Sequence, residues 1–323
     1  MTTGVLLTGF GGPDSIASVA PFMCNLMGKE PSEELVQRVC RRYLAIGGSS
    51  PLTEIAGEIA SELHEQLTKL GKDIPVAVGM RYWDPYIRDG LVQLKAHGCD
   101  RVVTVSLSPF ESKVAHGAYR EAIAAATAEI GGLEVVEAPL VSSLNAFADY
   151  FAGAISVALT DIEPNEGAIV VFTAHSLPES DLDPDDPYVT GLIHTANSIA
   201  ETMGMGAGKK GVKQAVLPGF SAFGCDEQPR AWFLVYQSKG NRPGPWLGPD
   251  LDELIDVAAA SGVKALVVCP IGFMTDHMET LYDLDIVAAD KALEADLEFI
   301  RVPVPNQHMI LMESVAKMVA DLA

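Results

Sequence analysis

The sequence lacks the features that mark membrane and secreted proteins. No apolar run approaches the roughly 18–20 residues that a membrane-spanning helix needs. The first residues carry no basic segment and become glycine-rich within a few positions, so we expect a first β-strand there and not a signal peptide. These absences predict a cytoplasmic protein without a membrane span. A periplasmic solute-binding protein, which would also have two α/β lobes, is disfavoured for the same reason.

Basic residues and cysteines are also scarce. The 323 residues include 22 Lys and Arg against 43 Asp and Glu, which gives a formal net charge of −21. Nucleic-acid binding depends on clustered basic residues, so this charge argues against DNA or RNA as a partner. The five cysteines are widely spaced and form no CxxC pair, as is typical of reduced cytosolic thiols; they are Cys24, Cys40, Cys99, Cys225 and Cys269.

Several motifs of nucleotide-binding and hydrolytic enzymes are missing. The sequence contains no Walker A loop, no GxSxG elbow and no HExxH pair. Residues 9–13 (GFGGP) are rich in glycine after the first expected strand, but they lack the GxGxxG order of a dinucleotide-binding turn.

What the sequence does contain is an alternation of short apolar runs with helical patterns. This alternation predicts an α/β fold with doubly wound parallel sheets flanked by helices. The expected strands are residues 5–8, 75–80, 101–107, 133–137, 168–173, 212–217, 265–270 and 297–302. The expected helices are residues 32–46, 54–70, 84–96, 115–130, 145–159, 186–203, 250–260, 276–292 and 307–322.

The two halves of the chain resemble each other in the order of their segments. Residues 4–11 (GVLLTGFG) correspond to residues 168–175 (AIVVFTAH), and residues 101–110 correspond to residues 264–273. We therefore expect two similar lobes, residues 1–142 and 143–323, with the active-site cleft between them. The last helix could pack back on the first lobe.

One acidic segment, residues 269–285 (CPIGFMTDHMETLYDLD), follows directly from an expected buried strand. Its helical spacing of three and four would put Asp276, Glu279 and Asp283 on one face, beyond the carboxyl end of that strand. Adjacent carboxylates repel one another, so the pattern favours a site for a cation or for proton transfer. A solvated acidic helix face remains an equally good interpretation of these residues alone.

Three further residues stand at positions where ligands bind in such folds. His175 ends an apolar strand in FTAHSLP and suits proton transfer or metal ligation, although a core-edge histidine bonded to backbone is the simpler interpretation. Trp246 lies in a loop rich in proline and glycine, where it would either contact an aromatic ligand or anchor the loop. Arg81 follows a strand end and could bind a carboxylate, unless it is paired locally on the surface.

Taken together, these segments resemble the ferrochelatases, the lyases that insert Fe²⁺ into a porphyrin in heme biosynthesis. The resemblance covers almost the whole chain through LLTGFGGPDS, GGSSPL, GMRYWDP, FTAHSLP, VYQSK with PWLGPD, and CPIGFMTDHMETLYDLD. The GFGGP and CPIGF forms are closest to the enzymes of Gram-positive bacteria, especially actinobacteria, which act on coproporphyrin III. The substrates implied are Fe²⁺ and a porphyrin, coproporphyrin III being favoured over protoporphyrin IX.

Carried over by position, the resemblance implies catalytic roles for His175 and Glu279. It implies metal handling by the same two residues with Asp276 and Asp283, and porphyrin contacts by Phe10, Arg81, Phe110, Trp246 and Phe273. Phe10 replaces a tyrosine that ligates product iron in some relatives, and residues 110–112 (FES) replace a segment that usually contains His or Tyr. No permanently bound cofactor is implied, and we expect no iron–sulfur cluster because no cysteine follows Cys269.

Three alternatives within this range of chemistry remain open. The porphyrin could be protoporphyrin IX, the metal could be cobalt as in corrinoid synthesis, or the chain could be a heme or porphyrin carrier without catalytic activity. A carrier would need the aromatic residues but not both His175 and Glu279.

Overall fold

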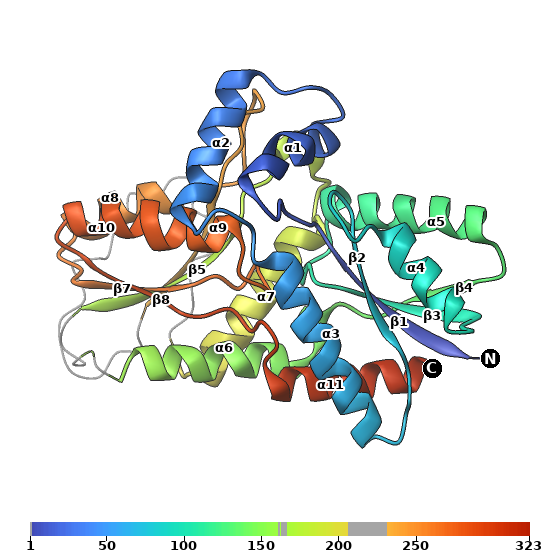
Figure 1. The fold of residues 1–323 in the computed structure, drawn as a ribbon. Helices are drawn as coiled ribbons and strands as arrows, with labels where there is room; N and C mark the ends of the chain where they lie inside the picture. The colour runs from blue at the N-terminus through green and yellow to red at the C-terminus, as the bar shows by residue number, and fades with distance from the viewer. Residues whose placement is uncertain (1, 161, 163–166, 206–230) are drawn as a thin grey trace. The chain divides into compact units, whose positions relative to one another are not determined.

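The computed structural model describes residues 2–160, 162, 167–205 and 231–323 (Figure 1). They form two compact α/β units. The first comprises Met1–Ala146, Met274–Met278 and Pro305–Ala323, and the second comprises Phe147–Phe273 and Glu279–Val304. The strand expected at residues 212–217 and the thiol of Cys225 lie outside the described residues. Across the described ranges, no helix has the length and apolar character needed to cross a membrane.

The first unit is built on a parallel sheet in the order β2-β1-β3-β4. Its strands are β1 (Thr3–Gly9), β2 (Val76–Met80), β3 (Arg101–Ser106) and β4 (Glu134–Glu137). Its helices are α1 (Val19–Met27), α2 (Glu33–Ala45), α3 (Leu52–Lys69), α4 (Ile87–Ala96), α5 (Ala118–Ile130) and α11 (Met309–Leu322). Figure 1 shows α4 and α5 over one face of the sheet and α3 crossing α11 on the other.

Helix α4 packs so closely on the first sheet that glycine is required at the contact. Ile87, Leu91 and Leu94, spaced four and three apart, form the buried face of α4 against Leu6. A Cβ atom at Gly90 would lie 2.5 Å from the Leu6 side chain and 2.8 Å from the Val78 carbonyl oxygen. The absent side chain therefore lets the helix backbone approach the strands.

The second unit repeats this plan with a parallel sheet in the order β6-β5-β7-β8. Its strands are β5 (Ala168–His175), β6 (Trp232–Gln237), β7 (Ala265–Cys269) and β8 (Glu298–Arg301). Its helices are α6 (Asn145–Ala158), α7 (Pro187–Thr202), α8 (Leu251–Ala260), α9 (Met278–Leu281) and α10 (Ala289–Glu294), with a π-helical stretch at Asp283–Ala288. In both units the first strand is central and the second strand is at one edge, so the similarity of the two halves and the α/β fold class are confirmed.

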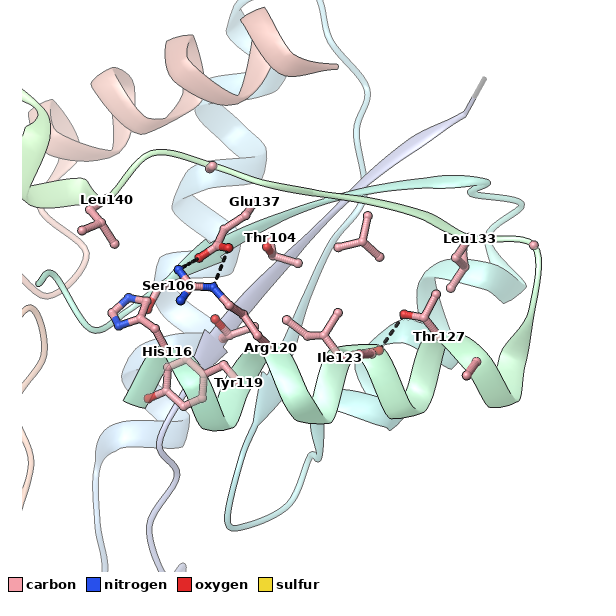
Figure 2. Close-up of a pocket in the computed structure, with 16 residues that line it drawn as sticks. Thr104, Ser106, His116, Tyr119, Arg120, Ile123, Thr127, Leu133, Glu137 and Leu140 are labelled. Atoms are coloured by element: carbon pink, nitrogen blue, oxygen red, sulfur yellow. Dashed lines mark hydrogen bonds and ion pairs between the residues drawn. The ribbon is translucent and has the colours of Figure 1, made fainter. Parts of the chain in front are cut away.

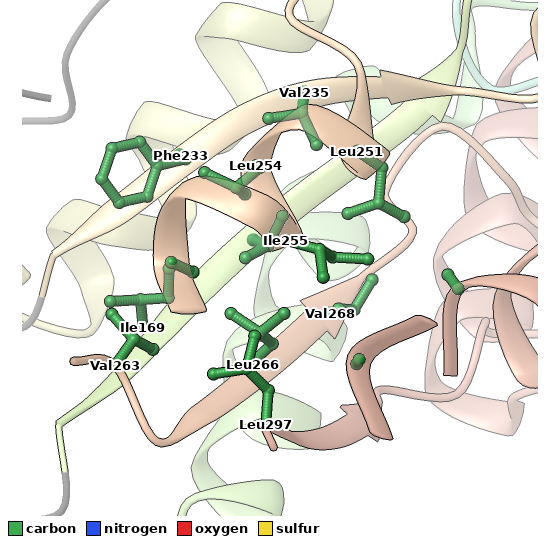
Figure 3. Packing of buried hydrophobic residues seen from close by; sticks show 14 of the residues in the cluster. Ile169, Phe233, Val235, Leu251, Leu254, Ile255, Val263, Leu266, Val268 and Leu297 are labelled. Carbon is green, nitrogen blue, oxygen red and sulfur yellow. The ribbon is translucent and has the colours of Figure 1, made fainter. Parts of the chain in front are cut away.

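One cluster of buried side chains in the second unit is mostly aliphatic (Figure 3). Strand β5 is buried along almost its whole length, and its alternate residues Ile169 and Val171 face the layer formed by α8 and α10. Asp250 caps α8 by accepting a hydrogen bond from the Asp252 backbone N–H at 2.9 Å. The aliphatic side chains in this layer are Leu251, Leu254, Ile255, Leu266, Val268, Leu284 and Leu297.

Two expectations about the second half are wrong in detail. Residues 232–237, which are missing from our expected strands, form strand β6, because the apolar run WFLVYQ pairs in parallel with β5. The acidic helix begins at Met278 rather than at residue 276, and it is interrupted at Tyr282. Helix α1 was not expected from the sequence at all.

The segment just before that helix contacts a residue far along the chain. Asn306 Oδ1 accepts a hydrogen bond from the Asp276 backbone N–H at 2.9 Å, and Asn306 N–H donates to the Met274 carbonyl at 2.8 Å. These contacts fix the position of the residues just before α9. Asp276 lies outside the helix, and the three acids do not share one α-helical face.

Candidate functional site

The candidate site is centred on His175, the last residue of β5. Its Nε2 atom lies 3.3 Å from Glu279 Oε1 on α9, and the two side chains are 30% and 33% exposed. The two residues that the family resemblance implies to be catalytic therefore lie in contact. Both belong to the second unit, and His175 stands at the carboxyl end of its central strand, where open α/β sheets place their ligands.

Backbone contacts fix the orientation of the His175 ring. Its Nδ1 atom donates a short hydrogen bond to the Ser176 carbonyl, which assigns the ring proton of neutral His175 to Nδ1. The Nε2 lone pair then points toward Glu279 and is available for a proton or a metal ion. The Tyr188 hydroxyl donates to the His175 carbonyl at 2.9 Å, and the Ser176 hydroxyl donates to the Leu247 carbonyl at 2.8 Å.

The electrostatic surroundings favour protonation of His175. Burial by itself lowers the pKa of His175, but the charge and hydrogen bond of Glu279 oppose it, as do the Ser176 carbonyl and Asp283. The net result is a pKa of His175 above its usual value. Burial also holds the pKa of Tyr188 well above its ordinary range, so its hydroxyl stays a donor at any working pH.

The strand next to His175 supports Glu279 and Asp283. Gln237 lies opposite His175 in the β5–β6 register, and its side-chain amide donates to the Glu279 carbonyl at 2.7 Å. The next residue, Ser238, has φ +60°, which is uncommon for a residue other than glycine. This conformation accompanies a 2.5 Å hydrogen bond from the Ser238 hydroxyl to Asp283 Oδ2.

Two aromatic residues predicted to contact the porphyrin also belong to the second unit. Trp246 is half-buried, and its Nε1 donates to the Arg242 carbonyl at 3.0 Å. Its ring closely covers Gly240, since a Cβ there would lie 2.7 Å from the ring, and its backbone forms a bridge with Pro178, three residues after His175. Phe273, in contrast, is buried, with 6% of its surface exposed.

The remaining predicted residues belong to the first unit. Phe10 is half-buried with its ring 4.7 Å from that of Tyr82, and Phe110 is buried. Arg81 lies 4.8 Å above the Tyr82 ring and donates from Nε to the Ala118 carbonyl at 3.1 Å. The Asp276 carboxylate accepts a hydrogen bond from the Asn306 side-chain amide at 2.9 Å. Phe10 and Arg81 thus both contact Tyr82. Asp276 instead is hydrogen-bonded to Asn306, in the segment before α11.

The pair of His175 and Glu279 has limited capacity for a metal ion. Within the described ranges, no three His, Cys, Asp or Glu side chains gather closely enough to hold one. An imidazole nitrogen and a carboxylate oxygen suit Fe²⁺ chemically, but two protein ligands leave most coordination positions open. With only two protein ligands, the pair is suited to brief contact with a metal ion and not to stable binding of one.

Sequence reasoning missed four supporting residues, namely Ser176, Tyr188, Gln237 and Ser238. Gln237 and Ser238 could have been found, because residues 232–238 (WFLVYQS) have the aromatic and β-branched composition of a strand. A strand there would end at Gln237, beside the carboxyl end of β5. The contact of Tyr188 with the His175 carbonyl depends on how α7 packs and has no comparable local signal.

Comparison with known proteins gives consistent results. A model of the ferrochelatase family matches residues 2–322. The chain is 30% identical to coproporphyrin III ferrochelatase 2 of Bacillus cereus, over 98% of this chain and 93% of that protein. It is also 30% identical to the coproporphyrin III ferrochelatase of Leifsonia xyli subsp. xyli, over 98% of this chain and 83% of that protein. Among solved structures, SirB from Bacillus subtilis with Fe³⁺ shares the fold, with a TM-score of 0.57 at 14% identity over 100% of this chain and 96% of SirB.

Proposed function

The chain belongs to the ferrochelatase family, and from this premise we propose that it inserts Fe²⁺ into coproporphyrin III with His175 and Glu279 as the catalytic pair. Members of the family are lyases of heme biosynthesis, and a porphyrin and Fe²⁺ are their substrates. The observation that carries the proposed roles is the 3.3 Å contact between His175 Nε2 and Glu279 Oε1 at the carboxyl end of β5.

The proposed role of the pair is to accept protons from the macrocycle. Insertion breaks two pyrrole N–H bonds, forms Fe–N bonds in their place and releases two protons. Neutral His175 accepts the two protons one after the other at Nε2, passing on the first before it takes the second, and the Glu279 carboxylate stabilises the imidazolium each time. The Ser176 carbonyl keeps Nδ1 protonated throughout, so the ring presents the same nitrogen in each turnover.

We propose Asp283 as the next acceptor on the way to solvent. It lies four residues beyond Glu279, contributes to raising the pKa of His175, and is oriented by the Ser238 hydroxyl. Incoming Fe²⁺ would contact the same imidazole and carboxylate before it reaches the pyrrole nitrogens. Asp276, predicted to belong to this relay, is engaged by Asn306 instead, which favours a structural role for it.

The choice of porphyrin rests on the relatives and on the residues that could contact it. The relatives from Bacillus and Leifsonia are named for coproporphyrin III, which carries four propionates where protoporphyrin IX carries two. Arg81 is our candidate partner for one propionate, and the half-buried rings of Phe10 and Trp246 are our candidates for contact with the macrocycle. Phe110 and Phe273, the other two proposed contacts, are buried.

Our proposal includes no resident cofactor, no iron–sulfur cluster and a cytoplasmic location. The four described cysteines are free thiols, as expected in a reducing compartment; they are Cys24, Cys40, Cys99 and Cys269. Iron and acid-labile sulfide analysis of the purified protein tests the cluster, and cell fractionation tests the location.

An anaerobic insertion assay tests the proposed activity. Fe²⁺ is supplied with coproporphyrin III or protoporphyrin IX, and the Soret band is followed, with Co²⁺ as a parallel metal. We expect Fe²⁺ insertion to be fastest with coproporphyrin III and to be abolished by His175→Ala, which should still bind the porphyrin. His194→Ala, an exposed histidine on α7, is the matched control. Full activity in His175→Ala would overturn the catalytic assignment, and faster turnover of protoporphyrin IX would overturn the substrate assignment.

A further inference from the structure

Gln237 contacts the segments that carry both members of the candidate catalytic pair. It is the last residue of β6, is 3% exposed, and lies opposite His175 in the β5–β6 register. Its backbone carbonyl accepts a hydrogen bond from the Ser176 N–H at 2.8 Å, and the Ser176 carbonyl in turn orients the His175 ring. Its side-chain amide donates to the Glu279 carbonyl at 2.7 Å. One residue therefore links the strand that ends at the histidine to the helix that carries the glutamate.

The same amide also contacts the residue that orients Asp283. The Gln237 amide nitrogen lies 3.4 Å from the Ser238 hydroxyl oxygen, and that hydroxyl donates to Asp283 Oδ2 at 2.5 Å. A glutamine amide has two N–H donors, so this contact and the one to Glu279 can form together. Glu279 precedes the interruption of the acidic helix at Tyr282, and Asp283 follows it. The amide is thus connected to the chain on both sides of the interruption.

Helix α9 is too short to hold Glu279 in place by itself. It has four residues, and the last four carbonyls of an α-helix have no partner within the helix. A helix of this length also has little stability of its own, because its nucleation is unfavourable. The Gln237 amide supplies an outside donor at the very residue that carries the catalytic carboxylate.

The fold itself gains little from this amide. The Gln237 Oε1 atom is buried and has no hydrogen-bond partner among the described residues. A buried acceptor that is left unpaired costs about as much free energy as a neutral hydrogen bond contributes, so the two effects largely offset each other. The presence of a glutamine at this buried position therefore needs an explanation other than stability.

The first unit has the same strand position without an amide. Met80 is the last residue of β2 and lies opposite Gly9, the last residue of β1, which is the place that Gln237 has in the second unit. Met80 is fully buried. A charged pair in this unit lies elsewhere, where Arg120 of α5 contacts Glu137 of β4 beside a pocket (Figure 2). The topology thus accepts methionine where no histidine stands opposite, so the glutamine is explained by the site and not by the fold.

We propose that Gln237 is a positioning residue for the insertion reaction, and that its amide holds Glu279 within hydrogen-bonding distance of His175. Gln237 acts through Glu279 and not on the porphyrin or the iron. The inference rests on the proposed function of that pair. Without the amide, α9 shifts and the contact between imidazole and carboxylate opens.

Gln237→Met tests the proposal, because methionine is a flexible, unbranched side chain without an N–H donor. Anaerobic Fe²⁺ insertion into coproporphyrin III gives kcat, and fluorescence quenching gives the porphyrin affinity. If the pair opens from 3.3 Å to about 5 Å, the weaker Coulomb attraction at effective dielectrics between about 20 and 80 corresponds to a fall in kcat of roughly twofold to twentyfold. We expect this fall with unchanged porphyrin affinity. An unchanged kcat, or a fall in porphyrin affinity alone, would overturn the proposal.

A matched control and a double variant separate positioning from a general structural effect. Gln66 is also buried, and its Nε2 donates to Glu62 within α3 at 2.6 Å, so Gln66→Met should keep the wild-type kcat. If Gln237 acts through the Glu279 carboxylate, adding Gln237→Met to Glu279→Gln should lower kcat little further. Effects that multiply in the double variant, or an equal fall in kcat in Gln66→Met, would contradict the positioning role.

Crystal structures of the wild-type protein and of Gln237→Met give a measurement that does not depend on turnover. In the variant, the separation of His175 Nε2 and Glu279 Oε1 should exceed about 4 Å, beyond hydrogen-bonding distance. An unchanged separation would overturn the proposal. A wider separation in a protein that inserts no Fe²⁺ would uphold the positioning role and overturn the proposed function alone. Gln237→Asn, which keeps the amide on a shorter side chain, takes the place of Gln237→Met if that variant does not fold.

Discussion

Glu279→Gln isolates the electrostatic part of the proposed mechanism, because glutamine keeps the size and one oxygen of glutamate but removes its charge. At the observed 3.3 Å, the attraction between imidazolium and carboxylate is about 1.3 kcal/mol in a water-like dielectric and about 5 kcal/mol at an effective dielectric of 20. Both side chains are about a third exposed, so solvent screening places the value between these limits. Since about 1.4 kcal/mol corresponds to a factor of ten in rate, we expect kcat to fall by roughly tenfold to a thousandfold.

The same substitution should shift the pH dependence in a defined direction. His175 must be neutral to accept a proton, so the rate falls as the pH decreases through its pKa. Glu279 raises that pKa in the wild-type protein, whereas burial lowers it. Removing the charge should therefore move the acidic limb of the pH–rate profile to lower pH. Because the folded-state pKa is raised, protonated His175 stabilises the fold at low pH, and the stability difference between the two proteins should shrink as pH rises through that pKa.

The assay is anaerobic Fe²⁺ insertion into coproporphyrin III, measured from the Soret band between pH 5 and 9. Porphyrin affinity is measured separately by fluorescence quenching, so that a loss of binding is not mistaken for a loss of chemistry. Glu294→Gln, an exposed glutamate on α10, controls for charge removal alone. A kcat within twofold of the wild-type value, together with an unmoved acidic limb, would refute the assignment of Glu279.

Three other predictions follow from individual contacts. Tyr188→Phe removes the donor to the His175 carbonyl and should lower the free energy of unfolding by about 1 kcal/mol in urea titrations, and it should reduce kcat without changing porphyrin affinity. Ile255→Ala, at a fully buried position, should lower the free energy of unfolding by about 2–5 kcal/mol, whereas Leu293→Ala, 76% exposed, should change it by less than about 0.5 kcal/mol. Asn306→Ala should destabilise the protein but leave kcat nearly unchanged if Asp276 is structural, and a large fall in kcat would restore Asp276 to the proton or metal route.

The overall architecture could be predicted because it depends on local patterns. Continuous apolar runs such as AIVVF identify strands buried on both faces, and their alternation with amphipathic segments predicts parallel sheets. The facing of His175 and Glu279 was also predictable, since one ends a central strand and the other follows the neighbouring strand. Carboxyl ends of adjacent parallel strands lie at one edge of the sheet, so their nearest side chains converge.

The errors occurred where distant residues decide the local structure. Asp276 was expected in the helix but lies before it, and its contact with Asn306, thirty residues away, has no local signal in the sequence. Strand β6 was concealed by the prolines and glycines that follow it. The roles of Gln237 and Ser238 went unnoticed for the same reason, since they depend on the register of β6 against β5.

The two units place the same backbone irregularity at comparable points. Each has a π-helical stretch in the helical segment after its third strand, at Lys113–Gly117 in the first unit and at Asp283–Ala288 in the second. Such stretches occur often at functional sites, because the wider turn accommodates one extra residue without disturbing the helix that follows. In the second unit, Leu284 and Ala288 stay in the core while Asp283 bonds to Ser238 near the site. In the first, the stretch buries His116 beside a pocket, so the same irregularity places a chemically competent side chain near the carboxyl edge of each sheet.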